Sequence, residues 1–222
     1  MKIKSILATV AVSLILASSS NAALLISGVF DGPLSGGTPK GVELYATENI
    51  ADLSAFAIGS ANNGGGTDGA EFVLSGSASA GDYIYIVGTG SDDELVSFFG
   101  LTDVTPFQTS AMFINGDDAI ELFDSTESVI DTFGDINVDG NGEDWEYLDG
   151  WAYRTGGTAG AFNVANWSFS GANAWDGASD NASSGAVMPI GTYTTTVVPE
   201  PNTYALLAGM IALSLVMIRR RS

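Results

Sequence analysis

The chain of 222 residues contains no cysteine and no histidine. The lack of cysteine excludes disulfides, thiol nucleophiles and thiolate metal sites, but an exported domain of this length does not need disulfides. The lack of histidine excludes the commonest general base, the Ser-His-Asp arrangement and most zinc or iron sites. Any catalysis by this chain would therefore depend on carboxylates.

Basic residues are also scarce, and they are unevenly placed. Five of the seven lie near the two ends of the chain, which leaves only Lys40 and Arg154 between them. All of the 26 acidic residues except Glu200 lie in that same body, which therefore carries a net charge of −23. Such a surface repels phosphates, so nucleic acid is excluded as a partner. Two interpretations of the charge remain open, namely solubility in a salty habitat and binding of divalent cations.

The C-terminal end has three parts in a fixed order. Pro199, Glu200 and Pro201 form a rigid turn, the apolar run 204–218 follows without a charge, and Arg219, Arg220 and Arg221 close the chain. As a helix the run would span roughly 22 Å, short of the roughly 30 Å hydrocarbon layer. Snorkelling arginines and local thinning compensate for the difference, so we expect a membrane helix with the arginines in the cytoplasm.

These three parts resemble the PEP-CTERM sorting signal of Gram-negative bacteria, and Pro199, Glu200 and Pro201 match its motif. The resemblance covers only about the last 25 residues. It implies recognition and cleavage by an exosortase-type membrane protease. The alternative is a C-terminal membrane anchor that is never cut.

The N-terminus has the features of a secretory signal peptide. Lys2 and Lys4 form a charged region, an apolar region covers 6–17, and Ser20-Asn21-Ala22 is a small-residue cleavage site. We therefore predict three segments: a signal peptide (1–22) for the Sec machinery and signal peptidase, a folded domain (23–198) and a sorting signal (199–222). The predicted location is the inner membrane, transiently or stably, and then the envelope, the cell surface or the extracellular matrix.

The body is predicted to be all-β. Short runs rich in Val, Ile, Phe and Tyr alternate with Gly, Asn, Asp and Ser, which favours a β-sandwich. We expect one short helix over 92–99, beginning with acidic residues. The expected strands are 24–30, 41–46, 56–60, 71–74, 83–87, 119–123, 129–133, 147–154, 167–170 and 192–198.

Several short motifs of the body resemble the bacterial lamin-tail domain. They include Leu24–Ser27, Val42–Tyr45, Glu71–Leu74 and Asp117–Leu122, followed later by Arg154, and Gly28 stands where that family often has Glu. Each motif is short, but together they cover most of the body. The resemblance implies an immunoglobulin-like β-sandwich, a domain that often serves as a surface module in secreted bacterial proteins.

One acidic loop fits the spacing of a calcium-binding EF-hand loop. In that pattern alternate oxygens converge on the cation, a glycine permits the turn, and a carboxylate twelve residues in completes the coordination. Two interpretations stay open, a Ca²⁺ site and a solvated loop between two strands, because the flanking segments read as strands rather than helices. The candidate ligands are Asp135, Asn137, Asp139, Asn141, Glu143 and Glu146, with Gly140 at the turn.

The function predicted from these features is an exported, non-catalytic protein of the surface, the exopolysaccharide matrix or a biofilm. The first alternative is a carbohydrate-binding module, in which aromatic side chains face solvent and stack on sugar rings. The second is a hydrolase that uses two carboxylates, for which the sequence singles out no pair. Asp117, Asp118 and Glu121 form a second acidic cluster after the turn Asn115-Gly116, which is either a site or turn residues followed by an exposed strand edge. The aromatic residues of the first alternative are Trp145, Trp151, Trp167, Trp175, Tyr147 and Tyr153.

Overall fold

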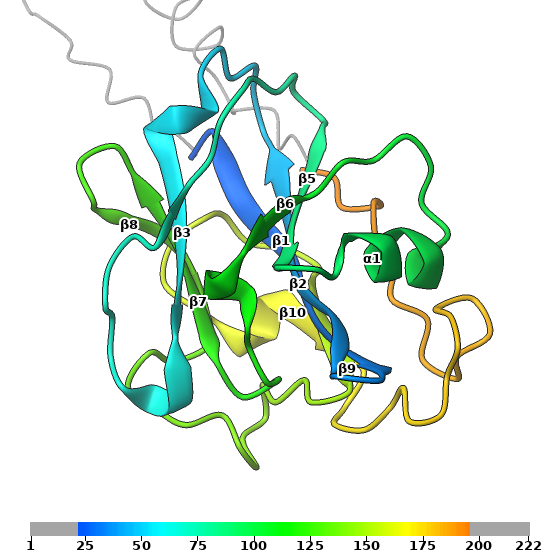
Figure 1. Cartoon of the computed structure of the whole chain (residues 1–222). Coiled ribbons are helices and arrows are strands. Elements are labelled where there is room, and N and C mark those ends of the chain that lie inside the picture. The colour runs from blue at the N-terminus through cyan, green and yellow to red at the C-terminus, as the bar shows by residue number, and fades with distance from the viewer. Residues whose placement is uncertain (1–21, 196–222) are drawn as a thin grey trace, which may run out of the picture.

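Ten β-strands and one α-helix make up residues 22–195, the part of the chain that the computed structural model describes (Figure 1). The Pro-Glu-Pro motif, the predicted membrane helix 204–218 and the arginine cluster lie outside these residues, as does the predicted signal peptide before Ala22. Within 22–195 no helix has both the length and the apolar character needed to span a bilayer.

The strands are numbered in chain order, as in Figure 1, and α1 lies between β5 and β6 in the chain. Short 3₁₀ helices occur at Leu53–Ala55, Asn62–Gly64, Ser110–Met112 and Val164–Asn166. The bounds are β1 Leu24–Leu34, β2 Thr38–Ala46, β3 Phe56–Ala61, β4 Phe72–Val73, β5 Tyr83–Gly88, α1 Asp92–Phe99, β6 Phe107–Thr109, β7 Ala119–Asp124, β8 Val129–Phe133, β9 Gly150–Arg154 and β10 Trp167–Phe169.

The strands form two sheets that face each other. One has the order β10-β9-β1-β2-β5-β6 and the other the order β4-β3-β7-β8, and every pairing is antiparallel except that of β5 with β6. Buried side chains of both sheets, such as Leu44 from one and Leu122 from the other, form a common apolar core. The prediction of a mostly β fold is confirmed in this form, as two sheets with a single α-helix among the described residues.

The outer face of the six-stranded sheet is covered as well. Leu95 and Phe98 of α1, together with Trp175, Met188 and Tyr193 of the segment 171–195, form a second apolar cluster on this face (Figure 1). The first nine residues of β1 are therefore all buried, since β1 is covered on both sides. This explains why apolar residues follow one another in its sequence, as in Leu24–Ile26, instead of alternating with polar ones.

A β-bulge in β1 makes room for the contacts between the sheets. Ile26 pairs with Leu44 of β2 but Gly28 pairs with Glu43, so Ser27 is the extra residue. A Cβ at Gly28 would lie 2.6 Å from Cε at the flexible end of Met188 and 3.0 Å from the Tyr153 ring. Glycine at this position therefore lets the covering segment pack closely on the sheet.

Most predicted elements are present in the structure, but β1 and β2 are longer and β4 is shorter than predicted, and further differences follow. The predicted helix 92–99 is α1 itself, with three acidic residues in its first turn and Gly100 in the left-handed conformation at its end. β9 begins at Gly150, later than the predicted 147, and β6 was not predicted. The predicted strand 192–198 is wrong for 192–195, which form no strand, and its remainder lies outside the described residues.

Candidate functional site

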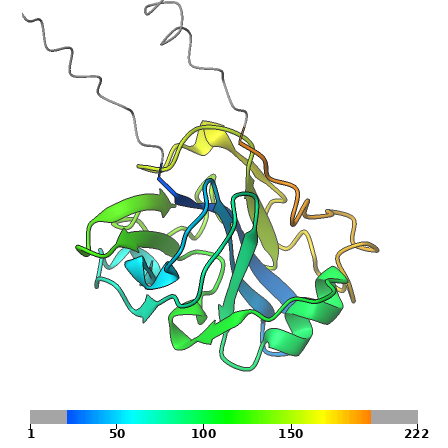
Figure 2. The same ribbon diagram turned by 90° about the horizontal axis from the view of Figure 1, so that it is seen from above.

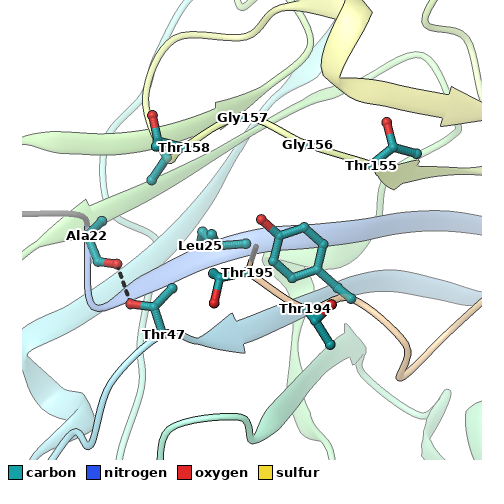
Figure 3. A pocket seen from close by; sticks show the side chains of 11 residues that line it. Ala22, Leu25, Thr47, Thr155, Gly156, Gly157, Thr158, Thr194 and Thr195 are labelled. Atoms are coloured by element: carbon teal, nitrogen blue, oxygen red, sulfur yellow. Dashed lines mark hydrogen bonds between the residues drawn. The ribbon is translucent and has the colours of Figure 1, made fainter. Parts of the chain in front are cut away.

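A small cavity of about 90 Å³ lies where the two ends of the described chain meet (Figure 3). Ala22 and Thr195 both line it, and Figure 2 shows both ends at one edge of the body. The Thr47 hydroxyl donates to the Ala22 carbonyl oxygen at 2.7 Å, and the Thr47 amide donates to the carbonyl oxygen of Ala23. We call it the chain-end cavity; its lining is Ala22, Leu25, Thr47, Thr155, Gly156, Gly157, Thr158, Ala159, Tyr193, Thr194 and Thr195.

Next to this cavity a buried ion pair joins the two sheets. Arg154 Nη2 of β9 lies 2.7 Å from Asp131 Oδ2 of β8, and both side chains are almost fully buried. The pair also holds the backbone of Ile26, next to the bulge: the Ile26 amide donates to Asp131 and the Ile26 carbonyl accepts from Arg154 Nε. The guanidinium also lies 4.7 Å from the centre of the Trp167 ring. The charged groups of Asp131 and Arg154 thus bind each other and the backbone of β1, and in this way they connect the two sheets.

Glu43 is the second buried carboxylate, and it binds the covering segment 171–195 to the sheet. It accepts hydrogen bonds from the Ser27 hydroxyl at 2.7 Å, the Tyr153 hydroxyl at 2.9 Å and the Gly191 amide at 2.6 Å. Tyr153 in turn accepts from the amides of Thr192 and Tyr193. Burial raises the pKa of Glu43 above its ordinary value of 4.5, although these hydrogen bonds oppose the shift.

Asp31 is a third buried carboxylate, near the end of β1. Lys40 Nζ lies 3.4 Å from its Oδ1, and burial raises the pKa of Asp31 to about 6 in spite of this neighbour. None of the three buried carboxylates lines a cavity found in residues 22–195. They serve the packing of the fold.

The acidic loop predicted to bind Ca²⁺ follows β8 and uses its oxygens locally. Asp135 accepts from the Asn137 amide, Asp139 from the Asn141 amide, and Glu146 from the Gly142 amide, at 2.9–3.0 Å. Within residues 22–195 no three acidic side chains are grouped closely enough to hold a metal ion. These contacts favour the interpretation as a solvated loop, and calcium binding stays a prediction.

Gly140 is the glycine that the calcium pattern places at the sharp turn of the loop, but the structure requires it there for packing. A Cβ at Gly140 would lie 2.5 Å from the Trp145 ring and 2.7 Å from the carbonyl oxygen of Asp117, so this position needs glycine for close packing. The residue of the loop with positive φ is Gly142, at 81°. The packing of Trp145 against the loop thus accounts for the glycine of the pattern.

The cluster Asp117, Asp118 and Glu121 splits between two environments. Asp118 is 1% exposed and receives the amides of Asn63 and Asn115, so it ties two loops together. Glu121 is buried in β7 rather than on an exposed edge. Burial and the charge of Asp118 raise the pKa of Asp117. No pair of catalytic carboxylates facing a cleft results from this arrangement.

An open groove runs between the acidic loop and the segment 159–164. It consists of two hollows, of about 690 and 260 Å³, which share Asp135, Ala161 and Phe162. We call it the Phe162 groove; its lining is Thr132, Gly134, Asp135, Ile136, Glu143, Asp144, Trp145, Ala161, Phe162, Asn163 and Val164. Its Asp135 and Glu143 are candidate ligands from the sequence, whereas no periodicity or motif in the sequence pointed to Phe162.

The aromatic residues expected to stack on sugars are buried. The four tryptophans are 0–8% exposed, and Tyr147 and Tyr153 are 0% and 3% exposed. The expectation that these tryptophans face solvent is therefore wrong, because they fill the cores between and outside the sheets. Only Trp145 lines a groove, and it does so beside Phe162.

Comparison with known proteins adds no relative to this description. No protein-family model, no curated protein and no solved structure matches the chain.

Proposed function

We propose that the chain is an exported, non-catalytic protein of the cell surface or exopolysaccharide matrix, sorted and cut by an exosortase-type protease at Pro199–Pro201. The observation that carries this proposal is that Ala22 and Thr195 line the same cavity. The segments that the sequence identifies as targeting signals are therefore attached at one edge of the folded body (Figure 2). A body with this geometry can be held at a membrane by either segment in the same orientation.

The contacts near the two ends are compatible with loss of both segments. Within residues 22–195, cleavage after Ala22 removes the hydrogen bond of the Thr47 hydroxyl to the Ala22 carbonyl oxygen and leaves β1 intact. Cleavage near Pro199 lies beyond Tyr193, whose amide is held by Tyr153. The folded body thus keeps its cores and its two buried carboxylate centres after processing at both ends.

A non-catalytic role is supported by the way the carboxylates are used. Asp131 is neutralised by Arg154, Glu43 is surrounded by donors, and Asp118 ties two loops together. The sequence has no histidine or cysteine to supply another catalytic group. We further propose that the two sheets belong to the immunoglobulin-like, lamin-tail class of sandwich, which the short antiparallel strands and the sequence motifs support.

Mass spectrometry of the protein from the producing cells tests the proposal. We expect a chain that begins at Ala23 and ends near Pro199, recovered from the envelope or matrix fraction. Replacing Pro199, Glu200 and Pro201 together by Ala should retain Arg219–Arg221 and keep the protein in the membrane fraction, whereas the neighbouring Asn202→Ala is the matched control and should be processed normally. Recovery of the intact 222-residue chain from the cytosol would overturn the proposal.

A further inference from the structure

We propose that the Phe162 groove binds a neutral polysaccharide. This inference is independent of the sorting signals, because it rests on side chains of the folded body alone. The two hollows share Asp135, Ala161 and Phe162, and both are open to solvent rather than closed pockets. An open hollow admits the middle of a long polymer as well as its ends, which a cavity as small as the chain-end cavity does not.

Phe162 lines both hollows, and we assign its ring as the floor of the proposed site. Phe162 is half-buried and lies edge-to-face against Phe133, with ring centres 5.3 Å apart, and against Trp145 at 6.3 Å. Trp167 lies 6.3 Å away on a tilted plane. A ring held on several sides loses little freedom when a ligand covers it. The C–H face of a pyranose ring is apolar and flat, so it can cover the exposed part of the Phe162 ring.

The rim of the groove offers hydrogen-bond acceptors. The side chains of Glu143 and Asp144 are exposed, and neither makes a hydrogen bond to another side chain or backbone group of residues 22–195. Asp135 uses one carboxylate oxygen for the Asn137 amide. Ionised carboxylates only accept hydrogen bonds, and sugar hydroxyls supply donors without bringing a charge. A polyhydroxylated ligand therefore matches both the floor and the rim.

Charge selects among the polysaccharides. The body carries a net charge of −23, and three carboxylates stand on the rim itself. Uronic, sulfated or phosphorylated polymers are repelled by this surface, more strongly at low salt. The occupant that fits is an uncharged hexose or pentose polymer. Binding of a cationic peptide to the same carboxylates is the competing outcome of the test.

Native affinity electrophoresis of the full-length chain tests the inference, in a polyoxyethylene detergent that carries no sugar headgroup. The gels contain dextran, mannan, xyloglucan or hydroxyethyl cellulose, with alginate as the anionic polymer. We expect retardation by at least one neutral polymer and none by alginate. Phe162→Leu keeps apolar volume beside Trp145 but lacks a flat face, and it should weaken binding about tenfold. Phe162→Ala should weaken it at least as much.

The rim is tested separately by Glu143→Gln with Asp144→Asn. This pair should weaken binding about threefold to tenfold, because it replaces one acceptor oxygen of each carboxylate by a donor group. The matched control is Glu48→Gln with Asp103→Asn, two exposed carboxylates that do not line the groove and whose replacement changes the net charge equally. It should leave the retardation unchanged.

Three results would overturn the inference. The first is no retardation of the wild-type chain by any of the four neutral polymers. The second is retardation that Phe162→Leu leaves unchanged. The third is binding to polylysine alone, lost in the Glu143→Gln and Asp144→Asn variant, which would make the groove a site for cationic chains. Each can occur whether or not the chain is exported and cut, so failure here is distinguishable from failure of the sorting proposal.

Discussion

The carboxylates inside the body and those of the loop 135–146 are hydrogen-bonded to partners at very different distances along the chain. Asp131 receives the Ile26 amide across 105 residues, and Glu43 receives the Gly191 amide across 148. In the loop, Asp139 receives an amide two residues away and Glu146 one four residues away. The interior carboxylates thus connect distant parts of the fold, whereas the loop carboxylates shape a turn.

This difference predicts unequal costs of substitution. A group that joins two sheets or a sheet and its cover is surrounded by atoms that cannot reach water when their partner is lost. When a surface carboxylate is substituted, water can take over its hydrogen bonds, so the free energy of unfolding changes little. The same residue type therefore contributes strongly or weakly to stability according to burial and partner.

The largest effect is expected for Arg154→Ala. It leaves the charge of Asp131 buried without a cation and the Ile26 carbonyl without its donor, and breaking such a pair costs about 3–5 kcal/mol. Urea unfolding followed by near-UV circular dichroism measures the loss. Lys40→Ala is the control, since Lys40 is the other basic residue of the body and its partner distance is longer, at 3.4 Å. Equal losses for the two variants would contradict the special role of the pair between the sheets.

A smaller effect, about 1–3 kcal/mol, is expected for Glu43→Gln. Glutamine keeps one acceptor oxygen but replaces the other by an NH2 donor, so either the hydroxyls of Ser27 and Tyr153 or the amide of Gly191 would face a donor. Hydrogen exchange should show faster exchange at Gly191, Thr192 and Tyr193, with the Ile26 amide unchanged. Exchange that accelerates equally at Ile26 would mean that the covering segment and the sheets open together.

The deficit of Glu43→Gln should also depend on pH. Because the pKa of Glu43 is raised in the folded protein, the folded state holds this proton more tightly than the unfolded chain does. Its contribution to stability is therefore full below the ordinary pKa of 4.5 and is lost as the pH rises through the folded value. The difference in the free energy of unfolding between wild type and Glu43→Gln should therefore shrink as the pH rises.

The smallest effect is expected for Asp139→Ala, which removes only the bond to the Asn141 amide and should cost less than about 1 kcal/mol. Thermal melting with and without millimolar calcium measures it. The local hydrogen bonds of the loop predict the same small loss in both conditions. If calcium raises the melting temperature and Asp139→Ala abolishes this rise, the loop binds calcium. Its carboxylates would then do more than shape a turn, contrary to the comparison with the interior carboxylates.

Strand positions were predictable because each depends on a local run of residues. The sequence 83–87 alternates, 92–99 begins with acids and ends before Gly100, and both segments fold as expected. β6 was missed because its three residues form a strand only by pairing in parallel with β5, a contact that no local pattern records. The segment 192–195 has the composition of a strand, but it is held instead by the Tyr153 hydroxyl.

The candidate site was less predictable for the same reason. The spacing of Asp135, Asp139 and Glu146 pointed to converging oxygens, but the loop folds so that each accepts from its own backbone. The tryptophans suggested a surface, yet burial of large apolar area is more favourable than exposure, and all four are inside. Phe162, which the sequence did not single out, lines both hollows of the groove.

Composition and local order in the sequence by themselves determined the β character of the body, its acidic charge, and the targeting signals predicted at its ends. Only the tertiary structure decided which carboxylates are buried, that Ala22 and Thr195 meet at one cavity, and that Phe162 lies open beside Trp145. The physical reason is that burial and pairing depend on residues more than a hundred positions apart, and these come together only when the sheets close on each other.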